Sequence, residues 1–392
     1  MAAFIKHPET GAQDANVPEA TKDDVNQAVA AAQRAFPEWS ASDLTKGGSY
    51  IKKLAALIKE HNDELSLLEA ESMGRLLPEF FEASPHLQAS ITMPKPGHLI
   101  QGQAILNTPG YVTMTLCQPF RVVAAIIPWN ASLLFFASNQ VKPKKPLGAT
   151  KFAELIDKAG FPPGVYNVIS SHGNPAGATL AWNSNLKKVI LEFGSKSPVI
   201  VFNNADLDHT VKDTMYSIQW NCGQVCMANF RVYIKDIISQ KFIEACKKAI
   251  AAAKANDLTH KGYETVLSCI DEGKRPGTLT LGGKRSFESI GGFFIEPTIF
   301  IIKTEEEAIP VYTKNIDRFM RVAEELNSGY LGITCTSPST ARDLLFGGYK
   351  SSGQGRAGYL HSIDNSLEVK SVITKVEGAV PDYKIHNSPR EE

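Results

Sequence analysis

The segment 121–127 constrains the fold of this chain more than any other. After its arginine, six apolar residues follow one another without interruption, which is the length of a strand and too short for a typical helix. A strand made only of apolar residues is typical of a parallel sheet that is covered on both faces. The helical pattern at 151–159, followed by a short apolar run at 165–169, indicates the same arrangement. The sequence therefore predicts an α/β fold with a parallel sheet.

Other periodic segments extend this pattern along the chain. A capping box at Thr21 and Asp24 predicts the start of a helix. Later helices are expected at 206–220, 240–254 and 316–326, and strands at 111–117, 189–193, 198–202, 231–234, 278–281, 294–301, 331–335 and 368–376. The polar residues 381–392 are expected to form a mobile tail.

Composition narrows the class of partner. The chain has 392 residues with 41 basic and 41 acidic side chains, so it lacks the basic excess of proteins that bind nucleic acid or anionic membranes. It contains no apolar run of transmembrane length and no basic, then apolar, leader pattern. Its six cysteines in so long a chain do not suggest a disulfide scaffold. We expect a cytoplasmic enzyme with a small-molecule substrate, no nucleic-acid or membrane partner and no metal site.

Cys226 is a candidate nucleophile. It ends the segment 220–226 (Trp-Asn-Cys-Gly-Gln-Val-Cys), where a turn with a glycine follows a helical pattern. Backbone N–H groups at such a turn can stabilise a thiolate or an oxyanion. A free thiol has a pKa of about 8.5 and needs help to ionise. The alternative is a buried structural cysteine, which is what most single cysteines are.

Glu192 and Asn130 each follow an apolar run. Glu192 ends the run 189–192 and precedes Phe-Gly-Ser, at the strand end where α/β sheets place ligands. Burial there would raise the pKa of the carboxyl group, which suits a general base. Asn130 follows the segment 121–127 and a rigid proline, so its amide could be a fixed hydrogen-bond donor. The alternatives are a solvent-facing glutamate and an asparagine in an ordinary turn.

Together the three residues supply the parts for acyl transfer through a thioester: an oxyanion donor, a base and a thiol. The segments around them are 128–130 (Pro-Trp-Asn), 159–167 (Ala-Gly-Phe-Pro-Pro-Gly-Val-Tyr-Asn), 192–198 (Glu-Phe-Gly-Ser-Lys-Ser-Pro), 223–226 (Gly-Gln-Val-Cys) and 346–356 (Phe-Gly-Gly-Tyr-Lys-Ser-Ser-Gly-Gln-Gly-Arg). In this order they resemble the motifs PWN, AGFPPGVxN, ELGGKSP, GQxC and PFGGxKxSGxGRE of the aldehyde dehydrogenase superfamily. The resemblance runs from about residue 4 to residue 376.

The resemblance implies a role for each matching residue. Cys226 would attack an aldehyde carbonyl, while the Asn130 amide and the backbone N–H of Cys226 would hold the developing oxyanion. Glu192 would then activate the water that releases the acid. Lys142, in Val-Lys-Pro, would reach the ribose of NAD or NADP. The remaining cofactor contacts would come from Ile127, Pro128, Trp129 and Gly194.

The resemblance also implies a domain plan. A truncated Rossmann-type cofactor domain would comprise 1–100 and 120–191, and an α/β catalytic domain would comprise 192–362. Strands at 101–119 and 363–380 would form a β-hairpin oligomerisation element, which implies a homodimer or homotetramer.

The sequence departs from the family mainly where a dinucleotide would bind. Family segments are missing around 139–142, 181–188, 300–307 and 309–314, and a helix is missing near 81–86. They include the turn that cradles the pyrophosphate at a helix N-terminus and the glutamate that holds the nicotinamide ribose. Lys145 replaces a glutamate that binds a ribose hydroxyl in the family, which favours NADP over NAD.

These losses leave three functions open. The first is aldehyde oxidation with NAD or NADP, with weak or absent cofactor binding as one outcome. The second is a redox-independent enzyme that uses Cys226 and Glu192 for ester or thioester hydrolysis, or for aldehyde condensation or cyclisation. The third is a non-catalytic remnant that acts as a binding or oligomer partner.

Overall fold

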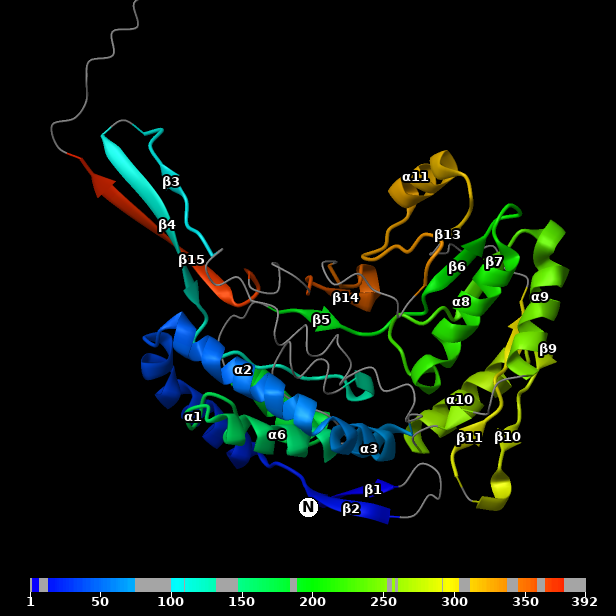
Figure 1. The fold of residues 1–392 in the computed structure, drawn as a ribbon, viewed down its shortest axis with the longest axis horizontal. Helices are drawn as coiled ribbons and strands as arrows, with labels where there is room; N and C mark the ends of the chain where they lie inside the picture. The colour runs from blue at the N-terminus through cyan, green and yellow to red at the C-terminus, as the bar shows by residue number, and fades with distance from the viewer. Residues whose placement is uncertain are drawn as a thin grey trace, which may run out of the picture.

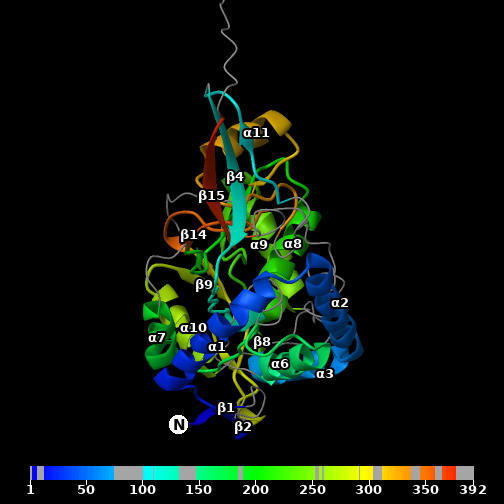
Figure 2. The ribbon, with the colours of Figure 1, turned by 90° about the vertical axis from the view of Figure 1, so that its left-hand side faces the viewer.

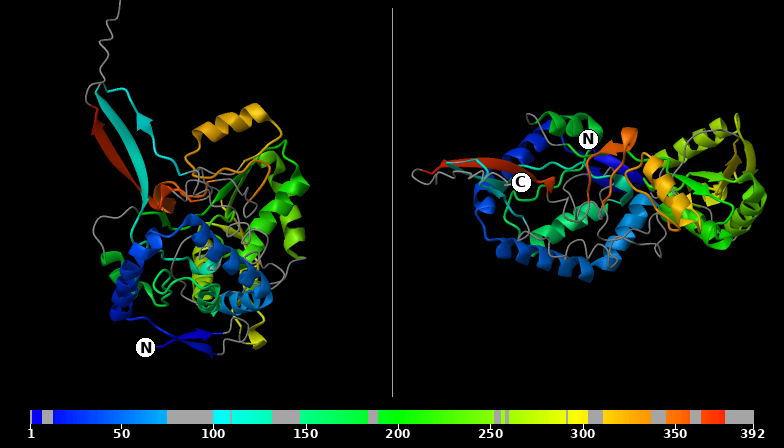
Figure 3. Two further views of the ribbon diagram at one scale, coloured as in Figure 1. Left: turned by 60° about the vertical axis from the view of Figure 1, so that its left-hand side comes forward. Right: turned by 90° about the horizontal axis from the view of Figure 1, so that it is seen from above.

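The structure is a computed structural model of the 392-residue chain. It describes residues 2–6, 13–74, 100–108, 110–131, 147–183, 189–251, 256–257, 260–290, 292–302, 311–336, 345–357 and 364–376. Three regions are distinct in Figure 1: a helical layer with α1, α2, α3 and α6, an α/β region around β6, β7, α8 and α9, and an arm of β3, β4 and β15 that projects from the molecule. Figure 3 shows the arm extending away from both regions, and in Figure 2, where the left-hand side of Figure 1 faces the viewer, it lies in front of the α/β region.

The helical layer contains α1 (Lys22–Ser40), α2 (Leu44–Glu60), α3 (Asn62–Met73), α6 (Leu147–Ala159) and the short α7 (Ala178–Trp182). Beside it lies a hairpin of β1 (Ala2–Lys6) and β2 (Gln13–Pro18). The predicted capping box is confirmed, because the Thr21 side chain accepts from the Asp24 N–H while Asp24 accepts from the Thr21 N–H. The core of the layer comes mainly from α2, α3 and α6: Leu54, Ala55, Ile58, Leu65, Ala149, Phe152, Leu155, Ile156 and Ala159.

The structure contradicts the strand predicted at 121–127. These residues form no regular secondary structure, and the side chains of Val123 and Ile126 are 48% and 64% exposed. Only Ile127 is buried, against the core of the helical layer. A doubly buried strand needs neighbouring strands, and none of the described residues pairs with this segment. The side chains of this segment are apolar enough to be buried, but the described part of the structure leaves most of them at least partly exposed.

Two further predicted strands are also wrong. The segment 165–169 forms no strand, and its neighbourhood has only an isolated bridge between Pro163 and Tyr166. The segment 331–335 is irregular, and Thr334 there has a positive φ of 46°. Both segments are rich in apolar residues, but neither forms a sheet with any strand among the described residues.

The α/β region contains a parallel sheet in the order β13 (Val311–Tyr312), β6 (Pro198–Val201), β7 (Arg231–Ile234). The helices α8 (Leu207–Gln219) and α9 (Asp236–Ala251) pack beside it (Figure 1). Its core contains Val199, Val201, Val211, Met215, Phe242, Cys246, Ile250 and Tyr312. The strands and helices predicted here at 198–202, 231–234 and 206–220 are confirmed to within a few residues.

Smaller sheets complete the region. β9 (Thr278–Leu281) pairs with β12 (Ile299–Ile301), and β11 (Phe294–Ile295) lies between β10 (Arg285–Ser286) and β8 (Asn256–Asp257). The predicted strand at 294–301 is thus divided in two. The helix α10 (His260–Gly273) was not predicted, whereas α11 (Ile316–Glu325) was. Most important for the site, β5 (Leu191–Glu192) pairs with β14 (Gly353–Gln354).

The arm is an antiparallel sheet in the order β15 (Leu367–Lys375), β4 (Tyr111–Pro119), β3 (Ala104–Ile105). Its two long strands pair along their whole length, which confirms both predicted strands. Val369 and Ile373 on β15 are each 67% exposed. Within the described residues, no helix is long and apolar enough to cross a membrane, and no three His, Cys, Asp or Glu side chains are grouped as metal ligands.

Candidate active site

A tight turn after α8 carries the candidate nucleophile. Asn221, Cys222 and Gly223 have φ values of 52°, 55° and 73°, so three consecutive residues adopt the left-handed conformation. That conformation is costly for any residue except glycine, and least so for asparagine among the others. Asn221 and Cys222 are buried, at 1% and 4% exposed. The chain leaves this turn at Gln224 and reaches Cys226, so the turn fixes where Cys226 lies.

Hydrogen bonds join this turn to the segment that carries Asn130. The Asn221 amide donates to the carbonyl oxygens of Asn130 and Gln224 at 2.9 and 3.0 Å. The Asn130 amide donates in turn to the Gln224 carbonyl oxygen at 2.8 Å. Residues about ninety positions apart are therefore held together, and the partner of the Asn130 amide, Gln224, lies two residues before Cys226 in the chain. Asn130 therefore lies against the segment 220–226, called the nucleophile loop below, and its catalytic role stays a prediction.

The end of α3 holds the same turn from the other side. The Cys222 thiol donates to the Gly74 carbonyl oxygen, and the Gln224 side-chain amide donates to the Met73 carbonyl oxygen, both at 3.2 Å. The last carbonyl groups of a helix have no partner within the helix, so they are available to such donors. Sequence reasoning missed this contact: Gln224 belongs to a recognised motif, but nothing in the sequence pairs it with residue 73.

Cys226 is a protonated thiol at neutral pH. Burial, reinforced by the negative charge of Glu192, raises the pKa of the Cys226 thiol to about 12. At pH 7 such a group is ionised in roughly one molecule in 100,000. Attack by sulfur therefore requires a base that accepts the thiol proton during the reaction, and Glu192 is the charged group whose field Cys226 experiences.

Glu192 lies at the end of β5, opposite Gly353 of β14. Burial raises the pKa of its carboxyl group, an effect that the hydrogen bond from the Gly194 N–H at 2.9 Å partly offsets. The backbone N–H of Phe193 also donates to the Ser352 carbonyl oxygen at 3.0 Å. The glutamate is therefore positioned by the ladder to β14, and its raised pKa suits a general base near neutral pH.

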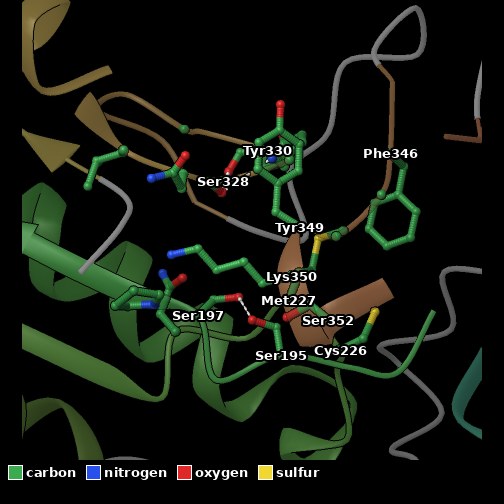
Figure 4. A pocket seen from close by; sticks show the side chains of 18 of the residues that line it. Ser195, Ser197, Cys226, Met227, Ser328, Tyr330, Phe346, Tyr349, Lys350 and Ser352 are labelled. Atoms are coloured by element: carbon green, nitrogen blue, oxygen red, sulfur yellow. Dashed lines mark hydrogen bonds between the residues drawn. The ribbon is translucent and has the colours of Figure 1, made fainter. Parts of the chain in front are cut away.

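Cys226 and Glu192 line one pocket of about 380 Å³. Its walls come from the segment after β5, the nucleophile loop, the loop 326–336 and the loop 346–352. Figure 4 shows Cys226, Ser195 and Ser352 on one side of this pocket and Tyr330 and Ser328 across from them. The Ser197 hydroxyl donates to the Ser195 hydroxyl at 3.2 Å. Asn130 does not line this pocket, so the structure places two of the three predicted catalytic side chains in it.

The predicted cofactor residues are only partly described. Ile127 is buried, while Pro128 and Trp129 are half-buried. Gly194 has a φ of 79°, and a side chain added there would meet nothing within 4 Å, so a flat ring has open space to approach the backbone. Lys142 and Lys145 lie outside the described residues. Because Ile127 packs into the core of the helical layer, Pro128, Trp129 and Gly194 are the described residues of this set with surface left to contact a cofactor.

Comparison with known proteins identifies the family of this chain. The sequence profile of the aldehyde dehydrogenase family matches residues 4–185, 180–310 and 307–372. Aldehyde dehydrogenase family 2 member B4 of Arabidopsis thaliana is 31% identical over 454 aligned positions, which cover 94% of this chain and 84% of that protein. Human retinal dehydrogenase 2 is 30% identical, over 95% of this chain and 88% of that protein. The crystal structure of PnpE in complex with nicotinamide adenine dinucleotide has a TM-score of 0.90 and 26% identity, covering 98% and 96% of the two chains.

The comparison also locates the shortening. The alignment with the Arabidopsis relative has more positions than this chain has residues, so the relative contains segments with no counterpart here. The profile match is broken at 180–185 and at 307–310, beside two of the places where the sequence predicts missing segments. The nucleophile loop and the Glu192 strand lie between these breaks. The chain is a shortened member of the aldehyde dehydrogenase family, the oxidoreductases that oxidise aldehydes.

Proposed function

We propose that this chain oxidises an aldehyde to a carboxylic acid with NAD or NADP, through a covalent intermediate on Cys226. The observation that carries the proposal is that Cys226 and Glu192, a thiol and a carboxylate far apart in the sequence, line one pocket. The reaction consumes one aldehyde, one water and one oxidised dinucleotide. It yields the acid, the reduced dinucleotide and a proton.

The first step is addition of sulfur to the carbonyl carbon. The Cys226 thiol is protonated in the resting protein, so its proton passes to the Glu192 carboxylate as the carbon–sulfur bond forms. The carbonyl oxygen becomes an oxyanion, which the Cys226 backbone N–H and the Asn130 amide stabilise. The hydrogen bond from the Asn130 amide to the Gln224 carbonyl oxygen holds this side chain against the loop that leads to Cys226.

A bound nicotinamide supplies the hydride acceptor that converts the Cys226 adduct into a thioester. Pro128, Trp129 and the open backbone at Gly194 would hold the nicotinamide, with Ile127 behind them in the core, and Lys142 and Lys145 would hold the ribose and phosphate groups. The structure of PnpE was solved with nicotinamide adenine dinucleotide bound, and another relative is described as an NADP-dependent enzyme. Both support use of this class of cofactor here.

Release of the acid is hydrolysis of the thioester. Glu192, once it has lost its proton, accepts a proton from water as the water oxygen attacks the acyl carbon. The carbon–sulfur bond then breaks and Cys226 recovers its proton. Because burial raises the pKa of Glu192, this carboxylate is a stronger base than an exposed glutamate.

One observation favours a second candidate. The segment 121–127, which the sequence predicts to be a buried strand and which falls in the implied cofactor domain, has no partner strand among the described residues. A protein that retains Cys226 and Glu192 without tight dinucleotide binding would hydrolyse esters or thioesters, because that chemistry needs no hydride acceptor.

The two candidates separate in one experiment. The purified protein is titrated with NAD and NADP by calorimetry and then assayed with an aldehyde panel at 340 nm and with p-nitrophenyl acetate at 400 nm. Dinucleotide-dependent absorbance that is lost in Cys226→Ala supports aldehyde oxidation. Ester hydrolysis that is lost in Cys226→Ala, without dinucleotide binding, supports the second candidate. If Cys226→Ala retains full activity in both assays, both candidates are wrong.

We further propose that the arm joins two copies of the chain. Val369 and Ile373 are exposed on the same face of β15, and apolar side chains that gather on one exposed face mark sites of contact between proteins. Sedimentation should therefore give a homodimer or homotetramer, and Ile373→Lys should shift it toward monomer. The cytoplasmic location stays a prediction.

A further inference from the structure

One wall of the pocket around Cys226 is the irregular loop 326–336 that follows α11. Residues of this loop line the pocket, and Figure 4 shows Ser328 and Tyr330 across from the side that carries Cys226. A helix or a strand fixes its own shape through regular backbone hydrogen bonds, whereas an irregular loop depends on contacts with its neighbours. The width of the pocket therefore depends on what holds this loop in place.

The backbone of Thr334 shows that the loop is constrained from outside. Its φ is 46°, in the left-handed region, where a β-branched residue is an outlier. Such a conformation persists only where the surrounding structure enforces it, and it is found preferentially at functional sites. An external contact is made at this same residue, because the Thr334 carbonyl oxygen lies 3.1 Å from Nε2 of His209.

His209 is placed by the start of α8. Its backbone N–H donates to the side chain of Asp206, which caps this helix, at 3.1 Å. One turn further along the same face of the helix, the Asp213 carboxylate lies 3.5 Å from Nε2 of His209. Both neighbours of Nε2, the Thr334 carbonyl and the Asp213 carboxylate, are acceptors. This nitrogen therefore carries the proton and donates it toward the loop.

A buried tyrosine fixes Asp213 in turn. Tyr312 of β13 is 1% exposed, and its hydroxyl donates to the Asp213 carboxylate at 3.0 Å. Burial, reinforced by the negative charge of Asp213, raises the pKa of the Tyr312 hydroxyl, so this group stays a proton donor. The Tyr312 ring also lies edge to face with the imidazole of His209. The carboxylate that orients His209 is thus held by the sheet behind the helix.

A second attachment joins the loop to the chain just after the nucleophile. The Asn229 side-chain amide donates to the Thr336 hydroxyl, and the two residues are only 1% and 4% exposed. The backbone N–H of Asn229 donates to the buried hydroxyl of Ser217 in α8 at 3.2 Å. Asn229 follows Cys226 by three positions in the sequence, so this contact ties the loop to the segment that carries the thiol.

We propose that His209 and Asn229 are positioning residues that hold the loop 326–336 at a fixed distance from Cys226 and so limit the size of the molecule that reaches the thiol. His209 acts through Thr334 and does not itself line the pocket, whereas Asn229 acts through Thr336. This inference rests on the proposed function in taking Cys226 as the nucleophile, and it adds a determinant of substrate size. A loop released from His209 would admit bulkier aldehydes.

The first test measures the size limit without turnover. N-ethylmaleimide and N-benzylmaleimide carry the same reactive ring and differ in the bulk of the attached group. Their rate constants are measured by mass spectrometry at Cys226, with the exposed Cys269 and free N-acetylcysteine as reference thiols. We expect the benzyl-to-ethyl ratio at Cys226 to lie about threefold to tenfold below both references, because a pocket discriminates against added bulk. A ratio equal to the references overturns the proposal.

His209→Gln and His209→Asn form a matched pair. Both remove the imidazole, but the glutamine amide reaches the place of Nε2 while the asparagine amide does not. His209→Asn should therefore raise the benzyl-to-ethyl ratio at Cys226 about threefold and accelerate hydrogen exchange in 330–335. His209→Gln should keep the values of the parent protein. Circular dichroism verifies that both variants are folded, and no change in His209→Asn, or an equal change in both, overturns the proposal.

Asn229→Ala tests the buried attachment. It releases the Thr336 hydroxyl and should raise the benzyl-to-ethyl ratio at least as much as His209→Asn. An unchanged ratio in the folded variant overturns the role of Asn229. If the variant does not fold, the two His209 variants decide the proposal.

The second test uses turnover and separates this inference from the proposed function. His209→Asn should raise KM for propanal about threefold and change kcat little, because Cys226 and Glu192 are not altered. The kcat/KM for 3-phenylpropanal relative to propanal should rise in the same variant. A fall in kcat for both aldehydes with unchanged KM overturns the inference and leaves aldehyde oxidation intact. If neither aldehyde is oxidised but the maleimide ratios behave as expected, the proposed function fails while the size limit stands.

Discussion

Asn221 offers the most direct test of how the nucleophile loop is held. Its side chain is 1% exposed and donates two hydrogen bonds, and its backbone has a φ of 52°. Asn221→Ala removes both donors and leaves a residue that adopts this φ with difficulty. Each hydrogen bond contributes about 0.5–1.5 kcal/mol, and the left-handed backbone costs alanine roughly 1 kcal/mol more than it costs asparagine. The variant should therefore lose about 2–4 kcal/mol of unfolding free energy.

Asn221→Gly is the matched control. It removes the same donors, but glycine adopts a positive φ without strain. It should lose only about 1–3 kcal/mol, the contribution of the two hydrogen bonds, so the difference between the two variants measures the backbone strain at this position. Urea unfolding followed by fluorescence gives both values, since the slope with denaturant depends on the surface exposed and should not change.

The same variants make an opposite prediction for reactivity. Burial is the main reason that the pKa of the Cys226 thiol is about 12, so a loosened loop should lower that pKa and accelerate alkylation by neutral iodoacetamide. Turnover should fall, because Cys226 is no longer aligned with Glu192. The reasoning is refuted if both variants remain within 0.5 kcal/mol of the parent, or if alanine and glycine cost the same.

Three further predictions follow from the site. Burial raises the pKa of Glu192, and protonation at low pH removes the base. The pKa that governs the acid side of the kcat/KM profile should therefore lie above that of an exposed glutamate. Glu192→Gln should abolish this pH dependence together with most of the activity. Gly353→Ala places a Cβ against the Leu191 carbonyl oxygen and forces a φ of 143° on alanine. It should therefore lower the unfolding free energy, measured in urea, by more than about 2 kcal/mol. Gly110→Ala, also at positive φ but in open space, should lower it by less. Asn130→Ala should lower kcat roughly 100-fold through loss of an oxyanion donor, and single-turnover acylation should show the defect; a normal acylation rate would remove Asn130 from the mechanism.

Helices and strands with a complete capping or periodic pattern of their own are mostly predicted from the local sequence. The capping box of α1, the strands β4 and β15, and the helices α8 and α11 agree with periodicity that is complete within each segment. α10 was missed although Tyr263, Val266, Leu267 and Ile270 follow helical spacing and pack in one cluster. That omission was avoidable.

The failures have a different physical origin. The segment 121–127 is as apolar as a buried strand, but pairing depends on other strands, and a single segment cannot reveal whether they are present. The same distinction applies to the site, where some features have a sequence signature and others do not. Motifs located Cys226, Glu192 and Asn130 in the sequence, whereas the bonds from Cys222 and Gln224 to the end of α3 join backbone groups that carry no residue signature.

Those contacts with α3 bear on how such a chain can evolve. The acceptors are main-chain carbonyl groups, which every residue has, so the side chains at the end of α3 can change without loss of the anchor. Asn221 and Gln224 also fasten the loop to the backbone of the segment that carries Asn130. Among the described residues, the nucleophile loop is thus anchored at one helix end and one short segment. Sequence can therefore drift along α3 while the loop keeps its attachment, since the acceptors there belong to the main chain.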